Sequence, residues 1–291
     1  MPDVKDNFQI DCRFLTKMDF KALHRTFLDA FSDYFVPFQI SESQLENHIA
    51  QNSVALERSV GAFCGAEMIG FTLNGFGDWN GRQTVYDAGT GVRPAYRKRG
   101  VGRALFDFMT PRFRSDGYQQ ILLEVISKNT AALRLYESLG FERTRRLIFF
   151  EGREKLPAAA VDGFEVREID APDWPFFESF ATGRTSWQNS VTALRRTARK
   201  LVLGIFRGAR CVGYGALFPS SGIISQIAVV PEYRRRGAAR ALVSEMQRRL
   251  APETRLRASN VDENLAELVG FLENLGFTET LSQIEMIKPL Y

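Results

Sequence analysis

The sequence contains Val92-Arg93-Pro94-Ala95-Tyr96-Arg97-Lys98-Arg99-Gly100-Val101-Gly102-Arg103-Ala104-Leu105, and the pattern returns as Val229-Val230-Pro231-Glu232-Tyr233-Arg234-Arg235-Arg236-Gly237-Ala238-Ala239-Arg240-Ala241-Leu242. Nine of the fourteen positions are identical, at a constant offset of 137 residues (92 to 229 and 105 to 242). A second match, Leu139-Gly140-Phe141 against Leu275-Gly276-Phe277, keeps an offset of 136 (139 to 275). Because the repeating unit is about half of the chain, the sequence predicts a tandem duplication.

Length and composition fit two soluble domains. A chain of 291 residues is long enough for two domains of roughly 100 to 200 residues each. Its 45% apolar and 25% charged residues are typical of globular proteins. We expect an N-terminal domain over residues 1–155 and a C-terminal domain over residues 161–291, with the aperiodic residues 154–160 as the linker.

The sequence favours a cytoplasmic protein without a metal centre. Uninterrupted apolar runs stay short of the ~20 residues of a membrane span, and residues 1–10 lack the apolar core of a secretory signal. The three cysteines are far apart and are expected to be reduced thiols. The two histidines, His24 and His48, are too few for common zinc sites, and they disfavour a Ser/His/Asp nucleophile.

The basic residues concentrate in the repeated segment. The net charge is +4, and the densest clusters are residues 97–103 and 234–240. A small polyanion bound at this segment would account for the arginines. We therefore expect neither nucleic acid nor a membrane as a partner, since no aromatic side chains alternate with the basic ones.

Hydrophobic periodicity predicts the same order of elements in both halves. In the first half we expect strands over residues 10–14, 60–63, 68–73, 84–92, 121–126 and 141–150, and helices over 20–31, 43–51, 100–113 and 129–139. Residues 74–83 are expected to form a loop. In the second half we expect strands over 164–169, 201–206, 212–218, 223–230, 255–258 and 283–287, and helices over 173–180, 187–197, from 237, and 262–275. Each half is thus predicted to be a mixed α/β domain.

The repeated glycine segment is suited to anion binding. A strand that passes through Arg-x-x-Gly-x-Gly directly into a helix exposes free backbone N–H groups at the helix N-terminus. The segment lacks the Gly-Lys-Ser/Thr of a Walker loop and the acidic ribose partner of a dinucleotide fold. The alternative interpretation is a solvated basic helix start.

At these residues the chain resembles the GCN5-related N-acetyltransferase (GNAT) superfamily, whose pyrophosphate loop reads Arg/Gln-x-x-Gly-x-Gly/Ala. Residues 97–102 fit this pattern fully, and residues 234–239 fit it with the permitted alanine. The resemblance implies two tandem domains, each a mostly antiparallel twisted sheet flanked by helices and splayed between its fourth and fifth strands. It also implies acetyl-coenzyme A (acetyl-CoA) as co-substrate, and no metal.

The segments Leu123-Glu124-Val125 and Asn129 to Phe141 resemble the ribosomal-protein N-terminal acetyltransferases. The resemblance implies that Glu124 is the catalytic base and Tyr136 the catalytic acid. The residues that it implies for coenzyme binding are Gly91, Val92, Arg97, Lys98, Arg99, Gly100, Val101, Gly102, Arg103 and Asn129 in the first copy, with Arg234, Arg236, Gly237 and Ala239 in the second.

Each of these residues also has a structural interpretation. Asn129 is a good helix N-cap, and Tyr136 has the spacing of a core tyrosine. Glu124 is flanked by apolar residues on both sides, so its carboxylate needs a partner or a purpose. Further candidates for acceptor selection, at even odds with surface or packing roles, are Asp78, Trp79, Asp87 and residues 187–189.

The second copy departs from the pattern at the acid and base. The position of Glu124 corresponds to Ser259, Asn260 or Val261, and that of Tyr136 to Phe271 or Leu272, with Glu273 only at the largest offset. We therefore expect an N-acetyltransferase that moves an acetyl group to a primary amine in its N-terminal domain, the C-terminal domain being degenerate or supporting.

Two alternatives remain open at this stage. One is a non-catalytic acyl-CoA sensor, and the other is catalysis in the C-terminal domain, as in tandem enzymes of the mycothiol synthase type. The acceptor, a small-molecule or peptide amine, is not specified by any stretch of the sequence. A monomer and a homodimer are both compatible with it.

Overall fold

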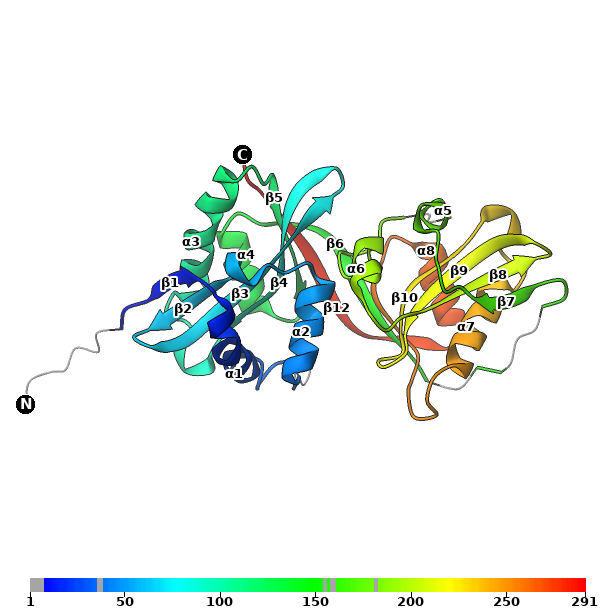
Figure 1. Cartoon of the computed structure of the whole chain (residues 1–291), viewed down its shortest axis with the longest axis horizontal. Helices are drawn as coiled ribbons and strands as arrows, with labels where there is room; N and C mark the ends of the chain where they lie inside the picture. The colour runs from blue at the N-terminus through cyan, green and yellow to red at the C-terminus, as the bar shows by residue number, and fades with distance from the viewer. Residues whose placement is uncertain (1–7, 36–38, 154–155, 158–160, 181–182) are drawn as a thin grey trace, which may run out of the picture. The chain divides into compact units, whose positions relative to one another are not determined.

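The computed structural model describes residues 8–35, 39–153, 156–157, 161–180 and 183–291, and it divides into two compact units (Figure 1). The first unit comprises Met1–Thr144 together with Glu285–Tyr291, and the second comprises Arg145–Ile284. Both units combine a sheet with helices. The predicted mixed α/β class is confirmed, and the chain has two units, as the repeat predicted.

From β1 to β5, the sheet of the first unit has antiparallel pairs and one parallel pair. Its strand order is β1-β2-β3-β4-β5-β12. The strands β1 to β4 pair antiparallel, and β4 pairs parallel with β5. Their bounds are β1 Asp11–Phe14, β2 Val60–Cys64, β3 Glu67–Trp79, β4 Arg82–Val92, β5 Gln120–Ile126 and β12 Phe277–Pro289.

The strands β4 and β5 separate part-way along their length. Their parallel pairing runs from Thr84 and Gln120 to Asp87 and Leu123, whereas β4 continues to Val92. A bulge at Ala88 interrupts the register between β3 and β4 at the same level. The predicted splay between the fourth and fifth strands therefore lies just beyond Asp87.

The expectation of a loop over residues 74–83 is wrong. Strands β3 and β4 pair as far as Trp79 and Arg82, joined by a two-residue turn, Asn80-Gly81. Both turn residues have positive φ, 57° and 73°, as a type I′ hairpin turn requires. The glycines of this stretch suggested a loop, but Asn-Gly between two extended segments is itself a hairpin signal.

Helices cover both faces of this sheet. On one face α1 (Phe20–Ala30) packs with Phe27 against Phe71 of β3. A Cβ added to the neighbouring Gly70 would instead meet Val101 of α3 (Val101–Ser115). Because successive strand residues point to opposite faces, α1 and α3 lie on opposite sides of the sheet. The other helices of this unit are α2 (Glu42–Gln51) and α4 (Thr130–Ser138).

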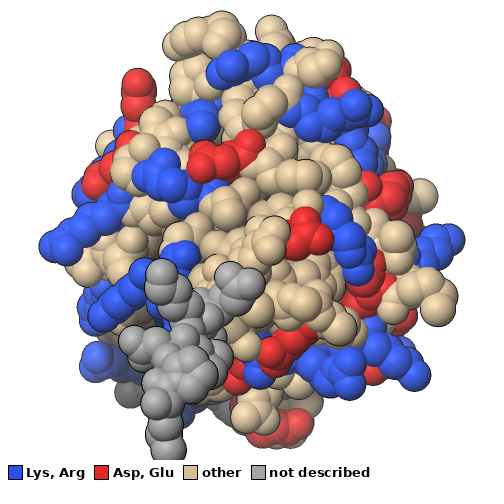
Figure 2. Space-filling view, turned by 90° about the vertical axis from the view of Figure 1, so that its left-hand side faces the viewer, with Lys and Arg blue, Asp and Glu red and all other residues tan. Residues whose placement is uncertain are grey.

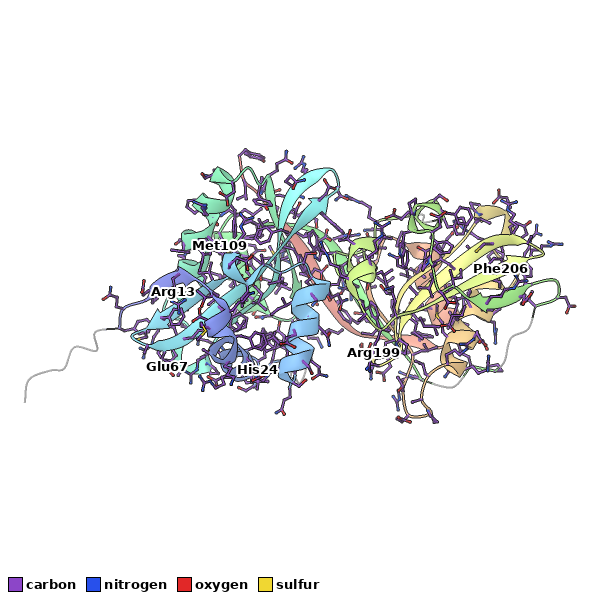
Figure 3. All side chains as sticks on the ribbon, viewed as in Figure 1. Arg13, His24, Glu67, Met109, Arg199 and Phe206 are labelled. Atoms are coloured by element: carbon purple, nitrogen blue, oxygen red, sulfur yellow. The ribbon has the colours of Figure 1, made fainter. Side chains whose placement is uncertain are left out.

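The helix α3 shows why these residues fold as they do. Leu105, Phe106, Met109 and Phe113 recur at helical spacing and are all fully buried (Figure 3 labels Met109). Arg112 and Arg114 lie in the last turn, where positive charge favours the helix C-terminus. The helix thus fixes the loop that precedes it against the sheet.

The second unit repeats this plan. Its strand order is β12-β6-β11-β10-β9-β8-β7. The strands β10 and β11 have a short parallel pairing, whereas β6 with β11, β9 with β10 and β8 with β9 pair antiparallel. The bounds are β6 Glu142–Gly152, β7 Glu165–Glu168, β8 Leu201–Arg207, β9 Arg210–Phe218, β10 Ile223–Val229 and β11 Arg257–Asp262, with helices α5 Trp174–Glu178, α6 Val191–Arg196, α7 Ala238–Arg248 and α8 Ala266–Asn274.

Strand pairing, not chain order, decides which unit some residues join. Leu147 to Glu151 of β6 pair with β11, and residues 145–152 of this strand belong to the second unit. The last residues, 285–291, belong to the first unit, where Leu290 N–H donates to the Gln119 carbonyl at 2.9 Å, next to β5. The division therefore differs from the expected domains 1–155 and 161–291, and residues 154–155 and 158–160 of the expected linker lie outside the described residues.

Two further sequence features can be followed in the structure. Cys12, Cys64 and Cys211 are free thiols, in agreement with the expectation of reduced cysteines. Among the described residues, no helix combines the length and the apolar character that crossing a bilayer requires.

Candidate functional site

The two repeated loops have the same backbone conformation. Lys98 and Arg235 adopt φ of 60° and 58°, and Gly100 and Gly237 both adopt φ of 84°. The two glycines are the N-caps of α3 and α7. Left-handed residues in front of a helix turn successive N–H groups toward one point, and this arrangement binds anions. Both copies keep the backbone of an anion-binding loop.

The first arginine of each loop is held by the protein itself. Arg97 Nε donates to the Val92 carbonyl at 3.2 Å, and Arg234 Nε donates to the Val229 carbonyl at 2.9 Å. The Arg97 guanidinium also forms two hydrogen bonds of 2.7 Å to Asp33. The shared contact closes the turn between strand and loop. A phosphate contact of these arginines stays a prediction.

The remaining loop cations lie at the surface. Lys98, Arg99 and Arg103 are exposed. The Arg99 guanidinium lies 4.9 Å from the centroid of the Phe8 ring, and the Arg236 guanidinium lies 5.6 Å from that of the Tyr233 ring. Arg103 donates to Ser138 Oγ at 2.6 Å. These cations surround the helix N-termini and supply positive charge there.

Two of the predicted cofactor glycines also satisfy packing. A Cβ on Gly91 would approach the Phe71 ring to 2.8 Å. A Cβ on Gly102 would approach Leu135 to 2.8 Å, so α3 and α4 come close at this residue. The second copy has Ala239 at the position of Gly102. Close helix packing therefore contributes to the choice of glycine in the first copy.

Glu124 lies on β5 immediately beyond the last pairing with β4. It accepts a hydrogen bond of 3.2 Å from the Tyr86 hydroxyl. Because Asp87 pairs with Leu123 and strand residues alternate, Glu124 and Asp87 point to opposite faces of the sheet. Glu124 thus faces the side that α1 covers, and it borders the splay.

Tyr136 of α4 lies on the other face. It is 7% exposed, and its ring contacts those of Phe106 and Phe141 at centroid distances of 5.7 and 5.6 Å. Burial, followed by the negative charge of Asp87, raises the pKa of the Tyr136 phenol well above its usual value. The phenol is therefore neutral and carries a proton that it can donate.

Asn129 has the N-cap role that the sequence offered, and its contact with coenzyme stays a prediction. Its side chain accepts a hydrogen bond from Ala132 N–H at 3.1 Å and so caps α4. It also lies close enough to the Tyr34 hydroxyl, in the segment after α1, to lower the pKa of that hydroxyl. Burial raises the pKa of Tyr34, so this hydroxyl is neutral too. Tyr34 was missed from the sequence, because it precedes the site by about a hundred residues.

Asp87 is a second buried carboxylate at the splay. It is 6% exposed, and burial raises its pKa to about 6. Its oxygens accept hydrogen bonds from Thr90 Oγ1 at 2.8 Å, Gly89 N–H at 3.0 Å and Thr72 Oγ1 at 3.4 Å. The sequence offered Asp87 for acceptor selection; the structure places it beside Thr90 and Tyr136.

The strand register identifies the counterpart of Glu124 in the second unit. The last parallel pair is Asp87 and Leu123 in the first unit, and Ile224 and Ala258 in the second. A one-residue bulge follows in β4 and in β10. Glu124 therefore corresponds to Ser259, one of the three positions that the sequence left open.

Helix α8 gives the other counterparts. It has nine residues, as α4 does, and begins 136 residues later (130 to 266). Tyr136 thus corresponds to Leu272, which is 1% exposed, and Asn129 corresponds to Leu265, whose side chain forms no cap. The second unit thus has Leu272, Ser259 and Leu265 in place of the predicted acid, the predicted base and the N-cap residue of the first unit.

A buried hydrogen-bond network occupies the splay of the second unit. Asn189 donates to the Ser259 carbonyl at 2.6 Å and accepts from Ser225 Oγ at 3.2 Å. Gln226 donates to the Asn189 carbonyl at 2.5 Å, and its own side-chain oxygen accepts from Tyr214 at 2.6 Å. These side chains satisfy one another, so Asn189 serves the fold of the second unit.

The other residues considered for acceptor selection have structural roles in the first hairpin and in the second core. Asp78 Oδ1 accepts from Gly81 N–H at 3.0 Å and fixes the turn. Trp79 and Trp187 are buried, at 7% and 5% exposure. His48 Nε2 lies 2.8 Å from the Ala88 carbonyl, and burial lowers its pKa. This histidine holds α2 against the bulge of β4.

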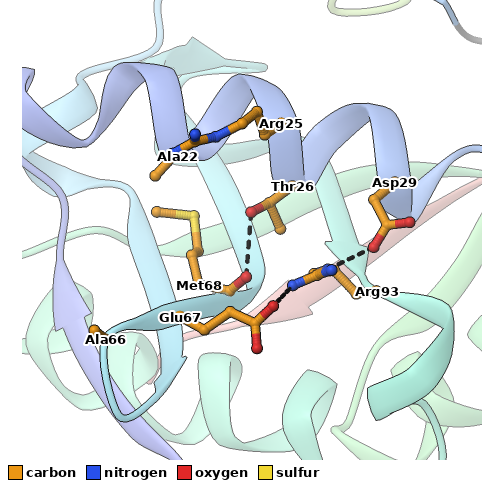
Figure 4. A pocket seen from close by; sticks show the side chains of 8 residues that line it. All are labelled: Ala22, Arg25, Thr26, Asp29, Ala66, Glu67, Met68 and Arg93. Atoms are coloured by element: carbon orange, nitrogen blue, oxygen red, sulfur yellow. Dashed lines mark hydrogen bonds and ion pairs between the residues drawn. The ribbon is translucent and has the colours of Figure 1, made fainter.

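A separate pocket lies beside α1 (Figure 4). Arg93 bridges its two carboxylates, with Nε 2.5 Å from Asp29 and an ion pair to Glu67. Thr26 Oγ1 donates to the Met68 carbonyl at 3.2 Å. These groups pair with one another and are separate from Glu124 and Tyr136, so we do not assign the chemistry to this pocket.

Charged side chains of both signs are mixed on one face of the molecule. Figure 2 shows the left-hand side of Figure 1, where Lys and Arg alternate with Asp and Glu. Ion pairs of the first unit include Arg13 with Asp19 and Arg58 with Asp116. On the face that Figure 2 shows, the described residues form no continuous basic surface.

Comparison with known families covers both halves of the chain. The model of the acetyltransferase (GNAT) family matches residues 21–141, and that of an acetyltransferase (GNAT) domain matches residues 177–287. Each match contains one copy of the repeated loop. The two matches together cover most of the chain.

Curated relatives match shorter stretches. A mycothiol acetyltransferase of Thermobispora bispora is 53% identical over 53 residues, which is 18% of this chain and 18% of that protein. The [ribosomal protein bS18]-alanine N-acetyltransferase of Escherichia coli is 40% identical over 80 residues, 25% of this chain and 54% of that protein. The chain thus spans a fifth to about half of the length of these relatives.

Solved structures match the whole chain in fold. A tandem GNAT protein from the clavulanic acid biosynthesis pathway has a TM-score of 0.75 at 15% identity, covering 97% of this chain and 99% of that one. A GCN5-related N-acetyltransferase from Sphaerobacter thermophilus has a TM-score of 0.72 at 20% identity, covering 100% and 97%. The two-unit architecture is therefore shared with known proteins.

Proposed function

The chain belongs to the GNAT acetyltransferase family as a tandem member, and on that premise we propose that its first unit transfers an acetyl group from acetyl-CoA to a primary amine. One observation carries the assignment to this unit. Glu124, Tyr136 and Asn129 border the splay of the first unit, whereas Ser259, Leu272 and Leu265 occupy these positions in the second.

The chemistry requires a base on the side of the amine and an acid on the side of the thiol. An amine with pKa near 10 must lose a proton before or during attack, and the departing thiolate must gain one. Glu124 and Tyr136 lie on opposite faces of the sheet, on either side of the splay. The proton thus leaves toward Glu124 and arrives from Tyr136, with the thioester between them.

Coenzyme binding is assigned to the loop and strand of the same unit. The N–H groups around Gly100 would hold the pyrophosphate at the start of α3, with Lys98, Arg99 and Arg103 nearby. Beyond Asp87, the edge of β4 no longer pairs with β5. Backbone groups near Gly91 and Val92 would bind the pantetheine arm and polarise the thioester carbonyl.

The acceptor class that we propose is a small-molecule or peptide primary amine in the cytoplasm. The relatives named above comprise a mycothiol acetyltransferase and a protein N-acetyltransferase, so both classes occur in the family. The matches to them cover too little of the chain to choose between the two.

The test is turnover of acetyl-CoA, followed as free thiol, with small-molecule amines and with peptides that have free N-termini. We expect Glu124→Gln and Tyr136→Phe to lower turnover about 100-fold while calorimetric affinity for CoA stays within two-fold. Glu137→Gln, an exposed change next to Tyr136, is the matched control. Wild-type turnover in both variants would contradict the roles. CoA binding without thiol release for any amine would favour an acyl-CoA sensor.

A further inference from the structure

The peptide unit between Ala88 and Gly89 is held at both ends by side chains. The Ala88 carbonyl accepts a hydrogen bond of 2.8 Å from His48 Nε2 of α2, and the Gly89 N–H donates to Asp87 Oδ1 at 3.0 Å. Because a peptide unit is planar, contacts at its two ends fix the orientation of the whole plane. Ala88 packs on the core cluster that includes Leu45 of α2, whereas Asp87 points to the other face of the sheet. His48 and Asp87 thus form a clamp on this peptide from opposite sides.

The contact of His48 with Asn52 determines which ring nitrogen carries the proton. Asn52 Nδ2 donates to the His48 backbone carbonyl at 2.9 Å, so the amino end of this side chain faces the histidine. The same nitrogen lies 3.2 Å from His48 Nδ1, and because an amide N–H can only donate, Nδ1 accepts. In a neutral imidazole the proton then resides on Nε2, which lies next to the Ala88 carbonyl. His48 is therefore a hydrogen-bond donor to the bulge of β4.

The helix that carries His48 is itself fixed to the sheet. In the segment after α2, the Ala55 N–H donates to the Asn74 carbonyl of β3 at 3.0 Å. A Cβ on Gly75 of β3 would approach the Asn52 carbonyl to 2.1 Å, so glycine at this position allows the close contact. Because α2 is attached to β3 at one point and to β4 at another, His48 reaches the bulge from a rigid support.

The clamp lies where β4 stops pairing with β5. Ala88 is the extra residue in the register between β3 and β4, and the parallel pairing with β5 ends one residue earlier, at Asp87. Beyond the bulge, Thr90 and Gly91 pair with β3. A bulge redirects the strand that follows it. The orientation of the clamped peptide therefore sets the direction of the backbone groups near Gly91 and Val92, which the proposed function assigns to the thioester carbonyl.

The second unit keeps the bulge but not the clamp. Its bulge residue is Ser225, at the position of Ala88, and Ile224 stands in place of Asp87. An isoleucine side chain cannot accept a hydrogen bond, and the Ser225 hydroxyl donates to Asn189 Oδ1 at 3.2 Å. The fold therefore forms this bulge without a carboxylate before it. The clamp occurs in the unit to which the chemistry is assigned.

We propose that His48 is a positioning residue for acetyl transfer. Together with Asp87 it fixes the bulge peptide of β4, and this peptide directs the backbone groups that follow it toward the thioester carbonyl. The inference rests on the proposed function, because it takes the edge of β4 in the first unit as the place where that carbonyl is polarised. In this account His48 neither touches the substrate nor exchanges a proton with it.

The kinetic test compares the two histidines of the chain. His24 Nε2 lies 2.7 Å from the Ile40 carbonyl, so His24→Leu removes the same kind of contact elsewhere in the first unit (Figure 3 labels His24). We expect His48→Leu to lower kcat about ten-fold with the KM for acetyl-CoA within about two-fold, whereas His24→Leu should keep kcat within about two-fold of the wild type. His48→Gln keeps an N–H donor near the position of Nε2 and should restore most of the turnover. Equal losses in the two folded leucine variants, or a folded His48→Gln protein no more active than His48→Leu, would overturn the proposal.

A second measurement follows the carbonyl itself and needs no turnover. Infrared difference spectra are recorded on the protein with acetyl-CoA that has an isotope-labelled acetyl carbonyl, in the absence of an amine. Weaker hydrogen bonds to the carbonyl raise its stretching frequency, so the band should lie higher in His48→Leu than in the wild type and in His24→Leu. An unchanged band in His48→Leu would overturn the proposal. Full turnover in Glu124→Gln and Tyr136→Phe would instead remove the base and acid of the proposed function, while this band would still show whether His48 positions the groups at the carbonyl.

Discussion

The two units share an anion-binding loop but differ in the splay behind it. Gly100 and Gly237 have the same φ, and the arginine three residues earlier makes the same contact to a carbonyl in both units. Behind the loop, the first unit places Glu124 and Tyr136, and the second places a closed network around Asn189. Similarity of the loops therefore does not extend to the residues that would perform chemistry.

This difference indicates that a duplicated domain can retain a loop because the loop helps the domain to fold. The arginine contact closes the turn between strand and helix, and the glycine supplies a left-handed N-cap. Both features help the unit to fold whether or not a phosphate binds. The residues predicted to perform chemistry at the splay, Glu124 and Tyr136, are the ones replaced in the second unit.

The largest expected effect comes from replacing the N-cap glycine of each loop in turn. Gly100→Val and Gly237→Val impose the same backbone strain, because both residues have φ of 84°. A Cβ at Gly237 would in addition approach Val161 to 2.9 Å, whereas one at Gly100 would have no neighbour within 4 Å. In the first unit the side chain would also disturb the N–H groups proposed to hold the pyrophosphate. We expect Gly100→Val to lower turnover about 100-fold or more and Gly237→Val to lower it less than three-fold.

Circular dichroism of both variants shows whether each is folded, and calorimetry with CoA shows whether binding is lost. A turnover loss confined to Gly237→Val would reverse the assignment and move catalysis to the second unit. Equal losses in two folded variants would show that both loops serve the reaction.

Much of the fold follows from local patterns in the sequence. The repeated segment identifies two copies, and the apolar spacing of α3 places that helix within two residues of its ends. The hairpin at Asn80-Gly81 was missed because glycines elsewhere in that stretch suggested a loop. The placement of residues 285–291 in the first unit could not be predicted, because pairing of a terminal strand depends on which sheet edge is open.

The candidate site was predicted only where its residues lie close in sequence. Glu124, Asn129 and Tyr136 come from β5 and the helix after it, and the structure places all three around the splay. Thr90 lies on β4 and Tyr34 in the segment after α1, so local spacing around Glu124 and Tyr136 gave no sign of them. The roles of all these residues remain predictions.

A smaller effect is expected from breaking the network that fills the second splay. Asn189→Ala would leave the Ser225 hydroxyl and the Ser259 carbonyl without the side-chain partner that each now uses. We expect a loss of about 2–4 kcal/mol in the stability of the second unit, because buried polar groups would be left unsatisfied. Turnover per folded molecule should stay the same.

Thermal unfolding, with the exposed change Thr192→Ala as the control, measures this loss. Two units can unfold separately, so the transition of the second unit has to be followed by itself. A loss of turnover in a folded Asn189→Ala protein would show that the second splay takes part in catalysis, and the comparison between the units would fail.

The smallest effect concerns the position that is Asp87 in the first unit and Ile224 in the second. Asp87→Asn removes the charge but keeps an acceptor for Thr90. Since burial raises the pKa of Asp87 to about 6, the folded protein holds this proton more tightly than the unfolded chain. The stability that this group contributes is therefore fully present below about pH 4 and is lost as the pH rises to about 6.

Asparagine does not ionise, so it causes no loss of stability as the pH rises. Asp87→Asn should therefore be more stable than the wild type at pH 8 and not at pH 4. The expected gain at pH 8 is about 1–2 kcal/mol, because weaker hydrogen bonds from Thr90 and Gly89 offset part of the relief. Melting temperatures at the two pH values measure it. If the difference in melting temperature between Asp87→Asn and the wild type does not change with pH, the Asp87 charge does not destabilise the first unit. The contrast with Ile224 would then be one of packing alone.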